Sequence, residues 1–131
     1  MGAVLLDTTV LIDLLRGRSD AERRLHALRA GGDDAYACAV NVEEIFRGLF
    51  ERERAVAERL ISGLRIAPLG AAEGRRAGEW RREHARRGQT LTQADCLIAA
   101  SAVSAGARLA TGNPKDFPMP GIDVEHWPAG A

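Results

Sequence analysis

Short apolar runs alternate with segments of helical periodicity along this chain, and that alternation restricts the fold more than any other feature. Apolar runs that read as strands cover residues 4–6, 36–40, 66–69, 107–111 and 122–125. Helical spacing and helix caps predict helices over residues 10–15, 20–30, from 41, around 56–64, 72–87 and 92–104. Strands that alternate with helices form a parallel sheet with right-handed crossovers. We therefore expect an α/β fold: one domain over residues 1–131 with a mostly parallel central sheet.

Four acidic residues stand where a predicted strand gives way to a loop or helix. They are Asp7, Glu44, Asp95 and Asp116. The carboxyl ends of parallel strands share one edge of the sheet, where ligands bind, so these residues should meet there. Carboxylates in one cleft repel each other unless a cation lies between them. The pattern therefore predicts a site for Mg²⁺ or Mn²⁺ and chemistry on phosphate groups.

Each acidic residue also has a purely structural explanation. Asp7 is a favoured residue type for capping the helix that follows it. Glu44 and Asp95 stand three residues after Asn41 and Thr92, the capping spacing that stabilises a helix by about 0.5–1 kcal/mol. Asp116 follows an Asn-Pro turn signal. Capping accounts for single residues, but it does not explain why all of them fall at one predicted edge.

Smaller polar residues accompany the acids in the sequence. Thr9 adds a hydroxyl beside Asp7, and Thr111 ends the strand that precedes Asp116. Either hydroxyl could support the site from outside the set of ligands. Asn113 lies in the same loop as Asp116 and is a further candidate for the site.

Charge and composition narrow the choice of partners. The chain carries 18 basic and 18 acidic side chains, so any surface for nucleic acid has to be local. The arginine-rich stretch 75–87 is either such a surface or an ordinary solvated helix face. No apolar run approaches the ~20 residues that span a bilayer, and the first residues resemble a strand more than a signal peptide. We expect no membrane partner, a cytoplasmic location, and buried reduced thiols at Cys38 and Cys96, which lack zinc-site spacing.

Four sequence blocks resemble those of PIN-domain nucleases, and most of all the VapC toxins of bacterial toxin–antitoxin pairs. The blocks are Asp7-Thr8-Thr9-Val10-Leu11-Ile12-Asp13, Glu44-Ile45-Phe46-Arg47-Gly48, Asp95-Cys96-Leu97-Ile98-Ala99-Ala100 and Thr111-Gly112-Asn113-Pro114-Lys115-Asp116-Phe117. The resemblance implies a PIN-like α/β/α sandwich with a parallel sheet that forms a homodimer. It also implies Mg²⁺- or Mn²⁺-dependent cleavage of RNA and a cognate antitoxin that enters the active-site groove. Asp7, Glu44 and Asp95 match three family acids, and either Asn113 or Asp116 takes the fourth position.

We therefore interpret the chain as a metal-dependent endoribonuclease that acts as a toxin. Asp7 and Asp95 would hold the metal with help from Asp116, and Glu44 would bind a second metal or orient the attacking water. One alternative is a small-molecule phosphatase with Asp7 as its nucleophile. That scheme usually has a second acid two residues on, where this chain has Thr9. Another alternative is a non-enzymatic module that binds a protein partner.

Overall fold

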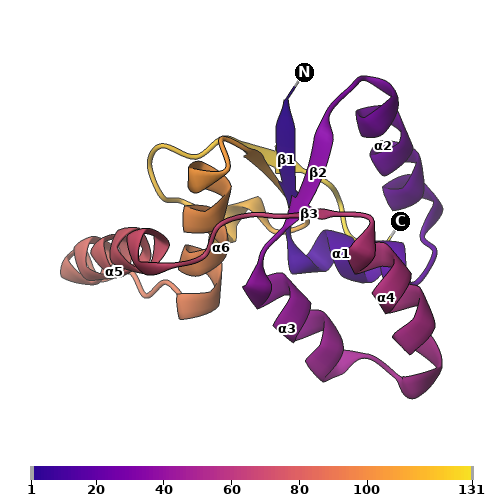
Figure 1. Ribbon diagram of the computed structural model, residues 1–131. Helices are drawn as coiled ribbons and strands as arrows, with labels where there is room; N and C mark the ends of the chain where they lie inside the picture. Colours follow the sequence, from indigo (N-terminus) through magenta and orange to yellow (C-terminus); the bar gives the residue numbers. More distant parts are fainter. Residues whose placement is uncertain (1, 131) are drawn as a thin grey trace.

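A parallel sheet forms the centre of the protein, which is described over residues 2–130 by a computed structural model (Figure 1). The strand order is β3-β2-β1-β4-β5, and every neighbouring pair is parallel. The strands are β1 (Ala3–Leu6), β2 (Asp34–Ala37), β3 (Arg65–Ile66), β4 (Arg108–Thr111) and β5 (Val124–His126). Their carboxyl ends therefore lie along one edge, and the predicted parallel sheet is confirmed.

Helices cover both faces of the sheet (Figure 1). The bounds are α1 (Thr8–Leu15), α2 (Ser19–Ala30), α3 (Ala39–Gly48), α4 (Arg54–Ser62), α5 (Ala71–Arg86) and α6 (Gln93–Ser104). Two short 3₁₀ turns, η1 (Glu51–Glu53) and η2 (Pro114–Asp116), complete the regular structure of the described residues. Helices α1, α2 and α4 contribute to one core, α5 and α6 contribute to the other, and α3 contacts both α1 and α6. The expected α/β/α sandwich is confirmed.

Strand β1 shows why the sheet is buried on both faces. Val4 and Leu6 pack into the core under α1 and α2, whereas Leu5 packs into the opposite core with Trp80 and Ile98. All three β1 side chains are 0% exposed. Successive side chains of a strand point to opposite faces, so a continuous apolar run suits a strand that is covered on both sides.

The start of α3 differs from the sequence-based expectation. The strand predicted over residues 36–40 ends at Ala37, and the helix begins at Ala39, two residues before the predicted start. Asn41 is the third residue of this helix, where its side-chain Oδ1 accepts a hydrogen bond of 2.9 Å from the Cys38 backbone N–H. The apolar residues Ala39 and Val40 suit a strand and a helix equally, so composition could not locate the boundary. Because α3 starts early, Glu44 lies in its second turn and does not cap it.

Of the caps predicted for the other helices, the one at α6 is confirmed and the one at α2 is wrong. Thr92 caps α6 as expected, since its Oγ1 accepts a 3.1 Å hydrogen bond from the Asp95 backbone N–H. Ser19 and Glu22 have the spacing of a capping box in the sequence, which predicts a cap at Ser19, but α2 begins at Ser19 itself and Arg18 precedes it without a side-chain bond. Most remaining boundaries agree within one or two residues, the usual uncertainty of helix ends.

The two cysteines are free and buried, as predicted. Burial raises the pKa of the Cys96 thiol to about 11, which keeps it protonated at neutral pH. Among the helices within residues 2–130, none combines the length and the apolar character that crossing a bilayer requires.

Truncation of Leu5 tests the account of the doubly covered sheet. Leu5→Ala leaves a cavity in the second core and should lower the free energy of unfolding by about 2–5 kcal/mol. Ile66→Ala, at a side chain in β3 that is 55% exposed, should change it by less than about 0.5 kcal/mol. Urea denaturation of both variants measures the difference, and equal losses would contradict the burial pattern.

Candidate active site

Asp7 lies at the centre of the carboxyl edge, directly after β1. Its backbone N–H donates to the Ala110 carbonyl of β4 at 2.9 Å, which continues the pairing of the two strands past Leu6. Its side chain makes no cap bond to α1. Instead, its Oδ2 accepts hydrogen bonds from Thr111 Oγ1 at 2.7 Å and from Thr9 Oγ1 at 3.2 Å. The carboxylate is therefore held by hydroxyls from two different elements.

Burial makes the charge of Asp7 costly. The residue is only 5% exposed. Burial raises the pKa of Asp7 and the charge of Glu44 adds to the rise, although the bonds from Thr111 and Thr9 oppose it. A carboxylate with this environment is typical of a functional site, because a capping residue is normally exposed.

Glu44 reaches the same edge from α3. Its Oε1 accepts a 2.6 Å hydrogen bond from Thr8 Oγ1, and that hydroxyl in turn accepts from Asn41 Nδ2 at 3.1 Å. Asn41 is fully buried, so this chain of three polar side chains joins α3 to the first turn of α1. Asn41 is itself held in place, since its Oδ1 accepts a hydrogen bond from the Cys38 backbone N–H.

Asp95 approaches from α6, where it is the third residue of the helix and half-buried. Burial is the main cause that raises the pKa of Asp95, and the negative charges of Asp7, Asp116 and Glu44 raise it further. Because the charges of Asp7, Asp116 and Glu44 all act on the Asp95 carboxyl, the four acids predicted from the sequence lie close together. The structure thus brings together residues that are up to 109 positions apart in the chain.

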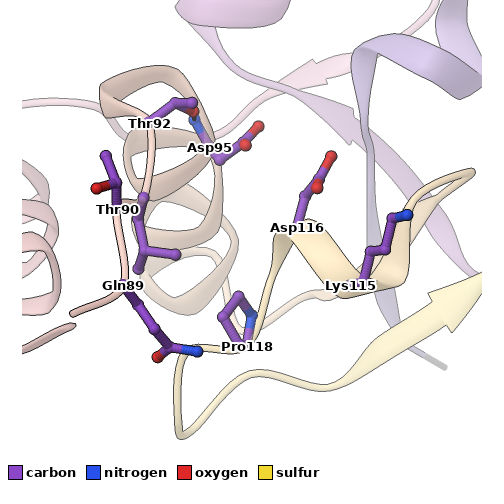
Figure 2. A pocket seen from close by; sticks show the side chains of 8 residues that line it. Gln89, Thr90, Thr92, Asp95, Lys115, Asp116 and Pro118 are labelled. Atoms are coloured by element: carbon purple, nitrogen blue, oxygen red, sulfur yellow. Dashed lines mark hydrogen bonds between the residues drawn. The ribbon is translucent and has the colours of Figure 1, made fainter. Parts of the chain in front are cut away.

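The loop after β4 supplies the remaining polar residues. Asp116 is exposed on η2, and its side chain and that of Asp95 point into the same opening (Figure 2). Asn113 is also exposed. Its backbone N–H, and not its side chain, makes the contact to the site, because it donates to Thr111 Oγ1 at 3.0 Å. Gly112 lies between Thr111 and Asn113 in a tightly packed position, because an added Cβ would lie 3.1 Å from Ala129 Cβ. Its N–H donates to Thr9 Oγ1 at 2.9 Å, which ties the loop to α1.

Within residues 2–130, no three His, Cys, Asp or Glu side chains converge closely enough to form a finished set of metal ligands. Carboxylate oxygens are nevertheless the donors that hard divalent cations prefer. Mg²⁺ retains several waters and needs only one or two carboxylates from the protein, so an open cluster fits its chemistry. Asp7, Glu44, Asp95 and Asp116 are the candidates for holding such an ion.

A hollow of about 310 Å³ opens beside Asp95 and Asp116, and the sequence analysis did not anticipate it. We call it the Gln89 hollow; its lining residues are Gln89, Thr90, Leu91, Thr92, Asp95, Lys115, Asp116 and Pro118 (Figure 2). In the sequence, residues 89–92 only connect two helices. The signal that could have found them is their polarity immediately before a candidate site acid.

Comparison with known proteins agrees with this arrangement. The PIN domain profile matches residues 4–118. Ribonuclease VapC10 of Mycobacterium tuberculosis is 35% identical over 116 residues, which cover 88% of this chain and 86% of that protein. A solved structure of DNA-bound VapBC from Salmonella typhimurium is similar with a TM-score of 0.84, at 27% identity, and covers 97% of this chain and 99% of that one. A toxin–antitoxin complex from Klebsiella pneumoniae is similar with a TM-score of 0.72, at 29% identity over 91% of this chain and 94% of that one.

The chain therefore belongs to the PIN-domain family, and its full-length relatives place it among the VapC proteins. The resemblance noted from four sequence blocks is confirmed.

The raised pKa of Asp7 predicts a gain in stability when its charge is removed. The folded protein holds this proton more tightly than the unfolded chain, whose carboxyl titrates near the ordinary value of 3.8. Protonated Asp7 therefore favours the folded protein most at pH values below 3.8. This benefit is lost as the pH rises through the pKa that Asp7 has in the folded protein. In metal-free buffer, Asp7→Asn should melt at a higher temperature than wild type at about pH 7, and this advantage should shrink as the pH falls to about 4.

Asp123→Asn is the matched control, because Asp123 is exposed and lies outside the carboxylate cluster. Thermal melting by circular dichroism at both pH values measures the effect. An Asp7→Asn variant that is less stable than wild type at neutral pH would contradict the electrostatic account of the site.

Proposed function

We propose that this protein is a metal-dependent endoribonuclease that cleaves RNA phosphodiester bonds and acts as the toxin of a toxin–antitoxin pair. One observation carries the proposal: four carboxylates from four separate elements lie close enough that the charges of three of them raise the pKa of Asp95, and that of Glu44 also raises the pKa of Asp7. The relative named ribonuclease VapC10 and the similarity to a toxin–antitoxin complex support the same function.

The carboxylates suit a Mg²⁺ or Mn²⁺ ion. In this proposal Asp7 and Asp95 hold the ion, and Asp116 assists directly or through water. When bound, such an ion acidifies water and stabilises negative charge on a phosphate group. The cluster also has an electrostatic reason to bind a cation, because the charges of Asp7, Asp116 and Glu44 raise the pKa of Asp95.

The protein's own residues orient this chemistry. Thr111 and Thr9 fix Asp7 through its Oδ2, so the direction of the carboxylate is set before any ligand arrives. Thr8 and Asn41 fix Glu44, which in this proposal orients the attacking water or helps to hold a second ion. Asp116 is a better candidate than Asn113 for the fourth position, since its charge acts on Asp95. Attack by water predicts products with a 5′-phosphate and a 3′-hydroxyl.

Asp95→Asn tests the activity. The purified, antitoxin-free wild-type chain should cut total cellular RNA into discrete fragments in Mn²⁺ and stop in excess chelator. Asp95→Asn should reduce cleavage by at least about 100-fold, a loss expected when a metal ligand is removed. Gel analysis of the RNA and sequencing of the fragment ends are the measurements.

The Asp95→Asn variant retains the backbone bond to Thr92, so an unchanged melting curve will show that its loss of activity is not a loss of folding. A folded, metal-loaded wild type that leaves all RNA intact contradicts the proposed activity. Fragments that end in a 2′,3′-cyclic phosphate contradict water attack, because that product requires the 2′-hydroxyl as nucleophile.

We further propose that a cognate antitoxin silences the site. A cleft of carboxylates attracts an arginine or lysine side chain from a bound peptide, whose charge would replace that of the metal. A small cavity of about 40 Å³ lies beside Glu44, among α1, α3 and η1, and offers a place for one small apolar group of the same partner. It is lined by Ile12, Leu15, Arg16, Glu44, Ile45, Gly48, Leu49 and Glu53.

Charge replacement predicts competition between the antitoxin and the metal. The complex that forms with a co-purified antitoxin should bind Mn²⁺ at least about 10-fold more weakly than the free chain, because a charge-assisted bond occupies the carboxylates. Isothermal titration calorimetry on both samples measures the two affinities. Equal affinities would show that the partner inhibits, if at all, without entering the carboxylate cluster.

The homodimer implied by the resemblance stays a prediction. The large apolar side chains exposed within residues 2–130 are Phe50, Val56 and Ile66. Light scattering on the purified chain gives the mass in solution directly.

A further inference from the structure

The Gln89 hollow shares its wall with the candidate catalytic site but differs from it in chemistry. Asp95 and Asp116 form one side, and the rest of the lining consists of neutral polar groups, apolar groups and one cation. Its volume of about 310 Å³ is at the lower end of the ~300–1,000 Å³ typical of small-ligand pockets. A group bound there would lie immediately beside the carboxylates.

The backbone around Gln89 is fixed by a glycine turn and three hydrogen bonds. Gly88 has a positive φ of 78°, which ends α5 and turns the chain, and the Gln89 N–H donates to the His84 carbonyl at 2.9 Å. The Arg81 Nε donates to the Leu91 carbonyl at 3.3 Å, and Thr92 caps α6. The wall of the hollow is thus held on both sides by helices.

The Gln89 side chain, by contrast, is exposed, and within residues 2–130 its amide has no recorded hydrogen-bond partner. Figure 2 shows the amide extending toward Pro118, at the far end of the hollow from the Asp95 carboxylate. An amide presents one donor and one acceptor group side by side, which matches the hydrogen-bonding edge of a nucleobase. Leu91 and Pro118 line the same hollow and offer apolar surface to the face of a base.

Lys115 is the only lysine of the chain, and it lies on the other side of the hollow beside Asp116 (Figure 2). No ion pair involves its ammonium group among the described residues. A free ammonium group binds a phosphate as a point charge. The hollow therefore combines a partner for a base with a partner for a phosphate.

We infer that the Gln89 hollow binds the nucleotide next to the cleaved phosphodiester bond, with Gln89 selecting its base and Lys115 contacting its phosphate. This inference rests on the proposed ribonuclease function. The bases of single-stranded RNA are free to splay out and to offer their edges to side chains, which duplex bases cannot do. An acidic peptide is a poorer occupant, because its carboxylates would face Asp95 and Asp116.

Gln89→Ala tests base selection, with Gln93→Ala as the matched control. Gln93 lies in a separate hollow, which Glu44 also lines together with Val40, Glu43 and Leu97, so a contact there would fall at a different position of the RNA. Sequencing of fragment ends from a randomised RNA pool gives the base preference at each position around the cut. Gln89→Ala should weaken the preference at one position adjacent to the cut by roughly 5- to 150-fold, the discrimination of a well-placed amide–base pair. Gln93→Ala should leave the preference at that position unchanged.

Lys115→Ala tests the phosphate contact and should raise KM several-fold with a smaller change in kcat, because a contact to substrate outside the reacting group is lost. Lys115→Arg should restore KM, since it restores the charge. Arg59→Ala, an exposed charge on α4, is the control and should leave KM unchanged.

Failure of this inference can be told from failure of the proposed function. A wild type that cleaves RNA, together with Gln89→Ala and Lys115→Ala variants that keep its base preferences and KM, overturns the inference and leaves the ribonuclease intact. A wild type that does not cleave RNA overturns both. Melting curves of the variants exclude unfolding as the cause of any change.

Discussion

The hydrogen bond from Thr111 Oγ1 to Asp7 Oδ2 is the contact on which the site depends. Asp7 directly follows β1, and Thr111 is the last residue of β4. These two strands are neighbours in the sheet, and their register pairs Leu6 with Ala110. Thr111 also accepts the Asn113 N–H, and Thr9 accepts the Gly112 N–H while donating to Asp7. The loop that carries Asp116 is therefore fastened to the carboxylate at the centre of the edge, and the sheet register positions all of these groups.

This arrangement gathers negative charge where solvent is scarce. Burial and mutual repulsion raise the pKa of both Asp7 and Asp95, so the folded protein is less stable than a version without these charges would be. Hydroxyl donors offset part of that cost, but no arginine or lysine ion pair involves these carboxylates among the described residues. Groups at functional positions commonly lower the stability of the folded protein in this way. The gathered negative charge also explains why a cation or a basic side chain from a partner should bind there.

The parallel sheet and its covering helices could be predicted because alternating apolar runs encode them directly. Asp7 and Asp116 follow strands β1 and β4, whereas Glu44 and Asp95 stand near the starts of helices α3 and α6. The early start of α3 could not be predicted, since Ala39 and Val40 suit either state, and this error wrongly made Asn41 a cap and Glu44 a capping acid. The structure gives Asn41 another task, as the donor that fixes Thr8 beneath Glu44. Thr9, which counted against a phosphatase because no second acid stands there, is a hydroxyl that holds Asp7. The Gln89 hollow depends on how two helices meet the loop after β4, and such long-range packing leaves no local pattern in the sequence.

The central claim is that the clustered carboxylates destabilise the free protein and that a divalent cation relieves them. The most direct test is the melting temperature of the wild type and of Asp7→Asn, with and without Mn²⁺. A ligand that binds only the folded state raises its stability with concentration. The account predicts a clear rise in melting temperature for the wild type and a much smaller rise for Asp7→Asn. Equal rises for the two proteins, or none for the wild type, would contradict it.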